Sequence, residues 1–139
     1  MTKLLLYDNS IEIRDLIKKT IYSASLKTSI VDCNTPEELH ENISTNPFDA
    51  VIIDIDTLGG KLLHIIEKAK SHNPKVMLII LTFFPNKKIQ DKLKLFGIEH
   101  YFDKNDQLNF FLDFLSFIPA KNPDENNNLI YKKVHQMNI

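Results

Sequence analysis

Short apolar runs in this chain end on side chains that can do chemistry. Asp8 and Asn9 follow residues 3–7, Asp54 follows residues 50–53, Thr82 follows residues 76–81, and Lys104 comes just after residues 98–102. If these runs are parallel strands, their carboxyl ends share one edge of a sheet, where open α/β proteins bind ligands. We therefore expect these side chains to lie close together.

Several of these groups are hard oxygen ligands. Asp8, Asp54, the Asn9 side chain and a backbone carbonyl near Asp56 suit Mg²⁺, which favours a few carboxylates completed by waters and phosphate oxygens. Taken alone, Asp8 with Asn9 would more often be a helix cap, because these residues satisfy exposed amides at helix starts. Their alignment with Asp54 favours the metal site.

With a cation in place, Asp54 is a candidate nucleophile for phosphoryl transfer. Its carboxylate would attack phosphorus in line, while the metal, the Lys104 ammonium and the Thr82 hydroxyl hold the three equatorial oxygens. Considered alone, Thr82 would be an ordinary threonine at a strand end, and Lys104 would be a solvated lysine in a loop. The joint placement is what favours chemistry.

An alternation of strands and helices must position these residues. Five βα units in sequence predict a parallel sheet with helices on both faces, because parallel strands need crossover connections. The helix at residue 36 has a strong start, since Thr35 can cap it and Pro36 suits its first position. The predicted strands are residues 3–7, 27–31, 50–54, 76–82 and 98–102, and the helices that follow them end near residues 24, 45, 72, 96 and 117.

Composition limits the chain to one domain and few kinds of partner. At 139 residues with 43% hydrophobic residues it can bury a single core, which we place at residues 1–118, followed by a polar tail at 119–139. Seventeen basic against eighteen acidic residues give a charge of −1, which favours neither nucleic acid nor an anionic membrane. The single cysteine, Cys33, and the lack of a long apolar run indicate a cytoplasmic protein.

The order of these segments resembles the receiver domain of two-component response regulators, over roughly residues 2–118. The resemblance implies a flavodoxin-like (βα)5 fold with strand order 2-1-3-4-5. It further implies that Asp54 accepts a phosphoryl group from a histidine kinase or phosphotransfer protein, and that Thr82 and Tyr101 form a switch pair. With no output domain after it, the chain would be a stand-alone signalling domain that acts on a downstream protein target. It would be no enzyme beyond its own autophosphorylation and dephosphorylation.

Three positions depart from that family pattern. Asn9 stands where an acid is usual, so Mg²⁺ is expected to bind weakly unless the Asp56 side chain compensates. Phe83 replaces a small residue after the threonine, and its ring could narrow access to Asp54. Asn105 replaces a proline after Lys104. These departures leave open a degenerate receiver that works as a binding adaptor without phosphorylation.

A phosphatase of the haloacid dehalogenase type is a less favoured alternative. Residues 52–58 resemble its first motif, in which the nucleophilic aspartate is followed two residues later by an acid, here Asp54 and Asp56. The residue that normally separates the second acid from the threonine is missing, and two βα units precede the motif. Release of inorganic phosphate with multiple turnover would favour this alternative.

The last helix is apolar around most of its circumference. Leu108, Phe111, Leu112 and Leu115 could pack on the sheet. The remaining aromatic residues would then form an interface with a second copy of the chain or another partner, unless the tail folds back over them. These residues are Phe110, Phe114 and Phe117.

Overall fold

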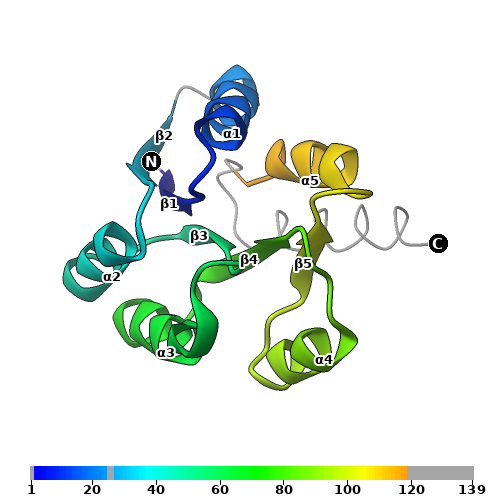
Figure 1. Cartoon of the computed structure of the whole chain (residues 1–139). Helices are drawn as coiled ribbons and strands as arrows, with labels where there is room; N and C mark the ends of the chain where they lie inside the picture. Colours follow the sequence, from blue (N-terminus) through cyan, green and yellow to red (C-terminus); the bar gives the residue numbers. More distant parts are fainter. Residues whose placement is uncertain (1, 25–26, 119–139) are drawn as a thin grey trace.

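A five-stranded parallel sheet organises the molecule (Figure 1). The structure is a computed structural model that describes residues 2–24 and 27–118. The strand order is β2-β1-β3-β4-β5, which confirms the fold predicted from the sequence. The strands are β1 (Thr2–Tyr7), β2 (Thr28–Cys33), β3 (Ala50–Asp54), β4 (Met77–Thr82) and β5 (His100–Asp103).

Helices cover both faces of this sheet. One face carries α1 (Ile11–Ala24) and α5 (Leu108–Leu115), and the other carries α2 (Pro36–Thr45), α3 (Leu62–His72) and α4 (Lys87–Leu95) (Figure 1). A short 3₁₀ turn, η1 (Gly59–Lys61), precedes α3. None of the helices in the described part of the chain is long and apolar enough to cross a membrane.

The core has two layers because successive strand side chains point to opposite faces. In β1, Leu5 and Tyr7 pack beneath α2 and α3, whereas Leu4 and Leu6 pack beneath α1 and α5. Every residue of β3 is buried, as expected for a central parallel strand covered on both sides. The continuous apolar runs that end at Asp54 and at Thr82 therefore form the central strands of the sheet.

Strand register brings the chemical groups to one edge. Tyr7 pairs with Ile53, Asp54 pairs with Leu81, and Thr82 pairs with Asp103. The residues just beyond β1 and β5, which are Asp8 and Lys104, therefore emerge level with Asp54 and Thr82.

Helix α2 begins as its sequence predicts. Thr35 is the N-cap, and its hydroxyl oxygen accepts a hydrogen bond from the Glu38 amide at 3.2 Å. Pro36 occupies the first turn, where its missing N–H costs nothing. These local signals favour a helix start at the point where the chain leaves β2 and turns back over the sheet.

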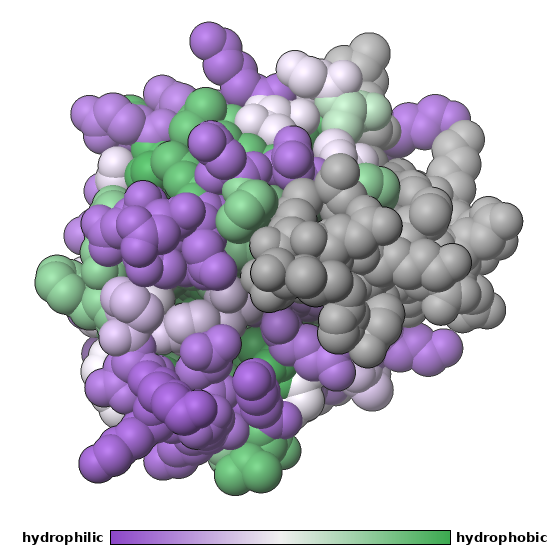
Figure 2. Space-filling view, turned by 90° about the vertical axis from the view of Figure 1, so that its right-hand side faces the viewer, coloured by the Kyte–Doolittle hydropathy of each residue, from purple (hydrophilic) through white to green (hydrophobic). Residues whose placement is uncertain are grey.

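Helix α4 is the most weakly anchored helix of the described chain. Asn86 caps its start by accepting from the amides of Lys88 and Ile89, but Leu93 is its only buried residue. Its exposed face is rich in lysine. Helix α4 lies at the bottom of Figure 1, and Figure 2 shows many hydrophilic side chains in the lower part of the molecule. Stability of α4 thus depends mainly on its ends.

Predicted boundaries are off by two residues at β2, β5 and α5, and β2 ends at Cys33 rather than at residue 31. Strand β5 begins at His100 because Gly97, with φ of 81°, lets the chain turn so that the Ile98 amide donates to the Leu93 carbonyl. Helix α5 is shorter than predicted and ends at Leu115 in a turn. The predicted polar tail, 119–139, lies outside the described residues.

Candidate functional site

Asp54 ends β3 as a buried carboxylate. Its side chain is almost fully enclosed, and one oxygen, Oδ1, accepts a hydrogen bond from the Asp56 amide at 3.0 Å. Burial raises the pKa of this carboxyl group above its ordinary value, and the amide hydrogen bond opposes that shift in part. Nearby Asp8 raises the pKa further by like-charge repulsion.

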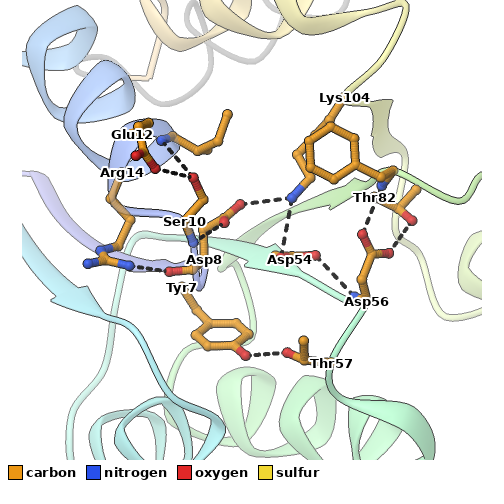
Figure 3. A network of polar contacts seen from close by, with 12 residues as sticks. Tyr7, Asp8, Ser10, Glu12, Arg14, Asp54, Asp56, Thr57, Thr82 and Lys104 are labelled. Atoms are coloured by element: carbon orange, nitrogen blue, oxygen red, sulfur yellow. Dashed lines mark hydrogen bonds and ion pairs between the residues drawn. The ribbon is translucent and has the colours of Figure 1, made fainter.

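Lys104 connects the two buried acids (Figure 3). Its Nζ lies 3.0 Å from Asp8 Oδ2 and 3.2 Å from Asp54 Oδ2, and all three side chains are at most 2% exposed. Two carboxylates and one ammonium leave the cluster with a formal excess of one negative charge. Such a cluster attracts a further cation or the proton of a reacting group.

Besides Lys104, two residues of the chain segment after β1 hold Asp8 in place. Its Oδ1 accepts from the Ser10 amide at 2.9 Å, and its backbone carbonyl accepts from Arg14 Nη1 at 2.6 Å. Arg14 is itself buried and pairs with Asp32 at 2.9 Å. Sequence reasoning missed Arg14, although its position three residues before Ile17 places it on the buried side of α1.

Asp56 does not point toward Asp8 and Asp54. Its Oδ1 accepts the hydroxyl proton of Thr82, and its Oδ2 accepts from the Phe83 amide at 2.9 Å (Figure 3). The Thr82 oxygen also accepts from the Phe84 amide at 2.9 Å. Asp56 therefore ties the loop after β3 to the loop after β4.

Phe83 lies over the cluster. Its ring centroid is 4.3 Å from Lys104 Nζ, which is a cation–π distance, and its carbonyl accepts from Asn105 Nδ2 at 2.8 Å. Phe83 is 41% exposed, so it is partly open to solvent while its ring lies over the ammonium. That Phe83 narrows access to Asp54 stays a prediction.

A hydroxyl pair fixes the far side of the loop after Asp54. Tyr7 is fully buried on β1, and its hydroxyl shares a hydrogen bond with Thr57 (Figure 3). Burial raises the pKa of the Tyr7 phenol, and the bond to Thr57 opposes this shift. The loop is thus held at Thr57 by β1 and at Asp56 by the end of β4.

Tyr101 reaches the start of α4. It is half-buried on β5, and its hydroxyl accepts from the Asn86 amide at 3.2 Å, at the start of α4. Its register partner on β4 is Ile80, two residues before Thr82. The two residues of the predicted switch are therefore connected through the β4–α4 loop, whose Asn86 amide bonds the Tyr101 hydroxyl, and their switching role stays a prediction.

The predicted metal ligands are only partly brought together. Asp8 and Asp54 converge on Lys104, Asn9 is exposed, and Asp56 is turned toward Thr82. Across residues 2–24 and 27–118 no group of three or more His, Cys, Asp or Glu side chains is arranged to hold a metal. Two convergent carboxylates fit a weakly held Mg²⁺ that keeps most of its water, and do not fit a closed protein cage.

The predicted aromatic interface on α5 is wrong for Phe114. This ring is fully buried and packs against Phe102 and His100, with centroids 5.5 and 4.7 Å apart. Phe110 is 40% exposed and Phe117 is half-buried, so these two residues stay available. The buried stripe consists of Phe111, Phe114, Leu115 and Ile118.

Known proteins resemble this chain at the level of structure. No family model matches the sequence, and no curated protein matches it. Solved structures do match, and several are receiver domains of response regulators. The chain has the fold of a response regulator receiver domain.

Three matches to this receiver fold illustrate its range. A CheY-like receiver domain from Methanospirillum hungatei is 19% identical with a TM-score of 0.66, covering 92% of this chain and 98% of that one. A response regulator from Burkholderia pseudomallei, with a phosphorylated aspartic acid and a calcium ion, is 12% identical with a TM-score of 0.66, covering 81% and 65%. A structure named adenylate cyclase from Rhodopirellula baltica is 15% identical with a TM-score of 0.64, covering 99% and 98%.

Proposed function

We propose that this receiver-like domain accepts a phosphoryl group on Asp54 and passes the signal on by contact with another protein. The observation that carries this proposal is the buried triad of Asp8, Asp54 and Lys104 at the carboxyl edge of the sheet. Buried titratable groups with specific charge partners are candidates for functional sites, and these lie at the strand ends where open α/β sheets bind ligands.

The proposed chemistry is a transfer from a histidine kinase, a phosphotransfer protein or a small acyl phosphate. An Asp54 oxygen attacks phosphorus, the bond from phosphorus to the donor breaks, and the electron pair stays with the leaving group. Lys104 offers positive charge to a phosphoryl oxygen, and the Thr82 hydroxyl offers a proton to another. Mg²⁺ bound by Asp8 and Asp54 would supply further positive charge at the same oxygens.

Support for a metal-assisted acceptor comes from the matched Burkholderia protein, whose structure holds a phosphorylated aspartic acid and a calcium ion. In the present chain the side chains of Asp8 and Asp54 offer the hard oxygens that such cations prefer. Receiver-like neighbours also favour a signalling domain over a turnover enzyme, although one neighbour is named adenylate cyclase.

A second candidate is an adaptor that works without phosphorylation. The contacts of Asp56 favour it, because this carboxylate already occupies the Thr82 hydroxyl and the Phe83 amide. Exposed Asn9 favours it too, since only two acids remain for a cation. In either case the signal leaves by protein contact, and exposed Phe110 with half-buried Phe117 is our candidate surface for a homodimer or a downstream protein.

Intact mass measurement tests the proposal. The chain is incubated with Mg²⁺ and acetyl phosphate, and we expect one added phosphoryl group that is absent in Asp54→Asn and present in the matched surface variant Asp106→Asn. Absence of an adduct with acetyl phosphate and with kinase would overturn the phosphoacceptor in favour of the adaptor. Repeated release of phosphate from a phosphomonoester would instead indicate the phosphatase.

A further inference from the structure

Asp56 gathers two hydrogen-bond donors of the β4–α4 loop on one carboxylate. The Thr82 hydroxyl donates to Oδ1 and the Phe83 amide donates to Oδ2 at 2.9 Å. Thr82 is buried, while Asp56 reaches it from an exposed position two residues after Asp54. The two donors thus form a fork that is already filled by an anion of the chain itself.

The same fork is adjacent to the proposed phosphoacceptor. The Asp56 amide donates to Asp54 Oδ1 at 3.0 Å, so the backbone of Asp56 supports the acceptor while its side chain holds the donors. A hydroxyl has a single proton to donate. The Thr82 hydroxyl therefore cannot serve Asp56 and a phosphoryl oxygen at the same time.

The negative charge of Asp56 opposes phosphorylation of Asp54, as its competition for the Thr82 hydroxyl does. A phosphoryl group on Asp54 would bring negative charge next to the Asp56 carboxylate, and like charges at short distance repel. The Phe83 ring over Lys104 and the Asn105 bond to the Phe83 carbonyl hold the loop in the arrangement that Asp56 uses. Leaving this arrangement requires Asp56 to give up both charge-assisted bonds.

We propose that Asp56 is an internal anion that occupies the Thr82 hydroxyl, which the proposed transfer uses, together with the neighbouring Phe83 amide, and so restrains phosphoryl acceptance by Asp54. Asp56 is then a positioning residue, which sets how readily the site is filled rather than taking part in bond formation. This inference rests on the proposed function, because it assigns a competitor to the same phosphoryl group.

Beryllofluoride, a phosphoryl mimic, tests this inference in the full chain. Mg²⁺ is first titrated for each variant so that every measurement is made at saturating metal. Beryllofluoride affinity and the Phe83 amide resonance are then followed by NMR in the wild type, Asp56→Ala and Asp56→Asn. Asp106→Ala, which removes an exposed acid from the loop after β5, is the matched control.

The expected result is a roughly tenfold gain in affinity for Asp56→Ala, equivalent to about 1.4 kcal/mol. The affinity of Asp56→Asn should lie between those of the wild type and Asp56→Ala, because its amide oxygen can still accept a hydrogen bond but carries no charge. The Phe83 amide should shift in both Asp56 variants and stay unchanged in Asp106→Ala. Equal or weaker affinity of Asp56→Ala would overturn the inference and leave the proposed function standing.

Failure of the proposed function gives a different pattern. If no variant binds beryllofluoride, Asp54 is not a phosphoacceptor, and inorganic phosphate is then titrated into Asp56→Ala. Movement of the Phe83 amide on addition of phosphate, absent in the wild type, would uphold Asp56 as the anion that fills the fork. An unmoved resonance would overturn it.

Discussion

Replacing Lys104 with methionine should leave two buried carboxylates without their shared ammonium. At about 3 Å and an effective dielectric constant of about 20, each contact is worth about 5 kcal/mol before desolvation is counted. Breaking a buried ion pair by removing one partner costs about 3–5 kcal/mol in practice. Loss of the Phe83 ring contact adds about 1 kcal/mol. We expect Lys104→Met to lower the free energy of unfolding by about 5 kcal/mol at pH 7.

Urea unfolding at pH 7 in the presence of a chelator measures this change. The double variant Lys104→Met/Asp54→Asn should recover most of the loss, because it removes the second negative charge that the ammonium neutralised. Lys92→Met, at an exposed position on α4, serves as the control and should change stability by no more than about 0.5 kcal/mol. In acid, where carboxylates take up protons, the cost of Lys104→Met should shrink.

The reasoning fails if Lys104→Met costs less than about 1 kcal/mol at pH 7. It also fails if the double variant is no more stable than the single one, since the loss would then come from packing of the lysine stem. Addition of Mg²⁺ gives an independent check, because a cation that binds between the two acids should stabilise Lys104→Met more than the control.

Three further predictions concern the core. Burial lowers the pKa of His100 below its ordinary value of 6.5, so the folded state resists its protonation and loses stability as the pH falls through that value. The slope of thermal stability against pH between about 7 and 5 should therefore be smaller in His100→Leu, and equal slopes would contradict this. Burial raises the pKa of Cys33 to about 11, so the native thiol should resist iodoacetamide at pH 8 and react only on unfolding. Phe114→Ala should cost about 3–5 kcal/mol in urea unfolding, against less than about 1 kcal/mol for Phe110→Ala, and comparable losses would refute the burial pattern.

Sequence reasoning succeeded where local signals and long apolar runs decide structure. The cap at Thr35, the buried strand before Asp54 and the alternation of βα units fixed the fold and its strand order. Because parallel strands end at one edge, the proximity of Asp8, Asp54 and Lys104 also followed from the order of the elements.

Prediction from the sequence was wrong, or gave no answer, where several arrangements satisfy the same pattern of residues. Helix α5 is apolar nearly all round, so two stripes with the same spacing could face the sheet, and the pattern placed Phe114 in the wrong one. The Asp56 side chain was considered as a compensating metal ligand, but it bonds Thr82 instead, since nothing in the sequence says which loop its carboxylate reaches. Arg14 went unnoticed because a charged residue on a helix is normally exposed.

The weak anchoring of helix α4 affects how easily this part of the chain opens locally. A helix that buries little apart from Leu93 can open locally at a small fraction of the free energy needed to unfold the sheet. Its start is tied to β5 by the bond between the Asn86 amide and the Tyr101 hydroxyl, and the loop before it contains Phe83, whose amide bonds Asp56. The segment that exchanges most readily between alternative arrangements thus begins directly beside Asp56. In hydrogen exchange its amides should therefore report, before any others, what occupies the edge of the sheet.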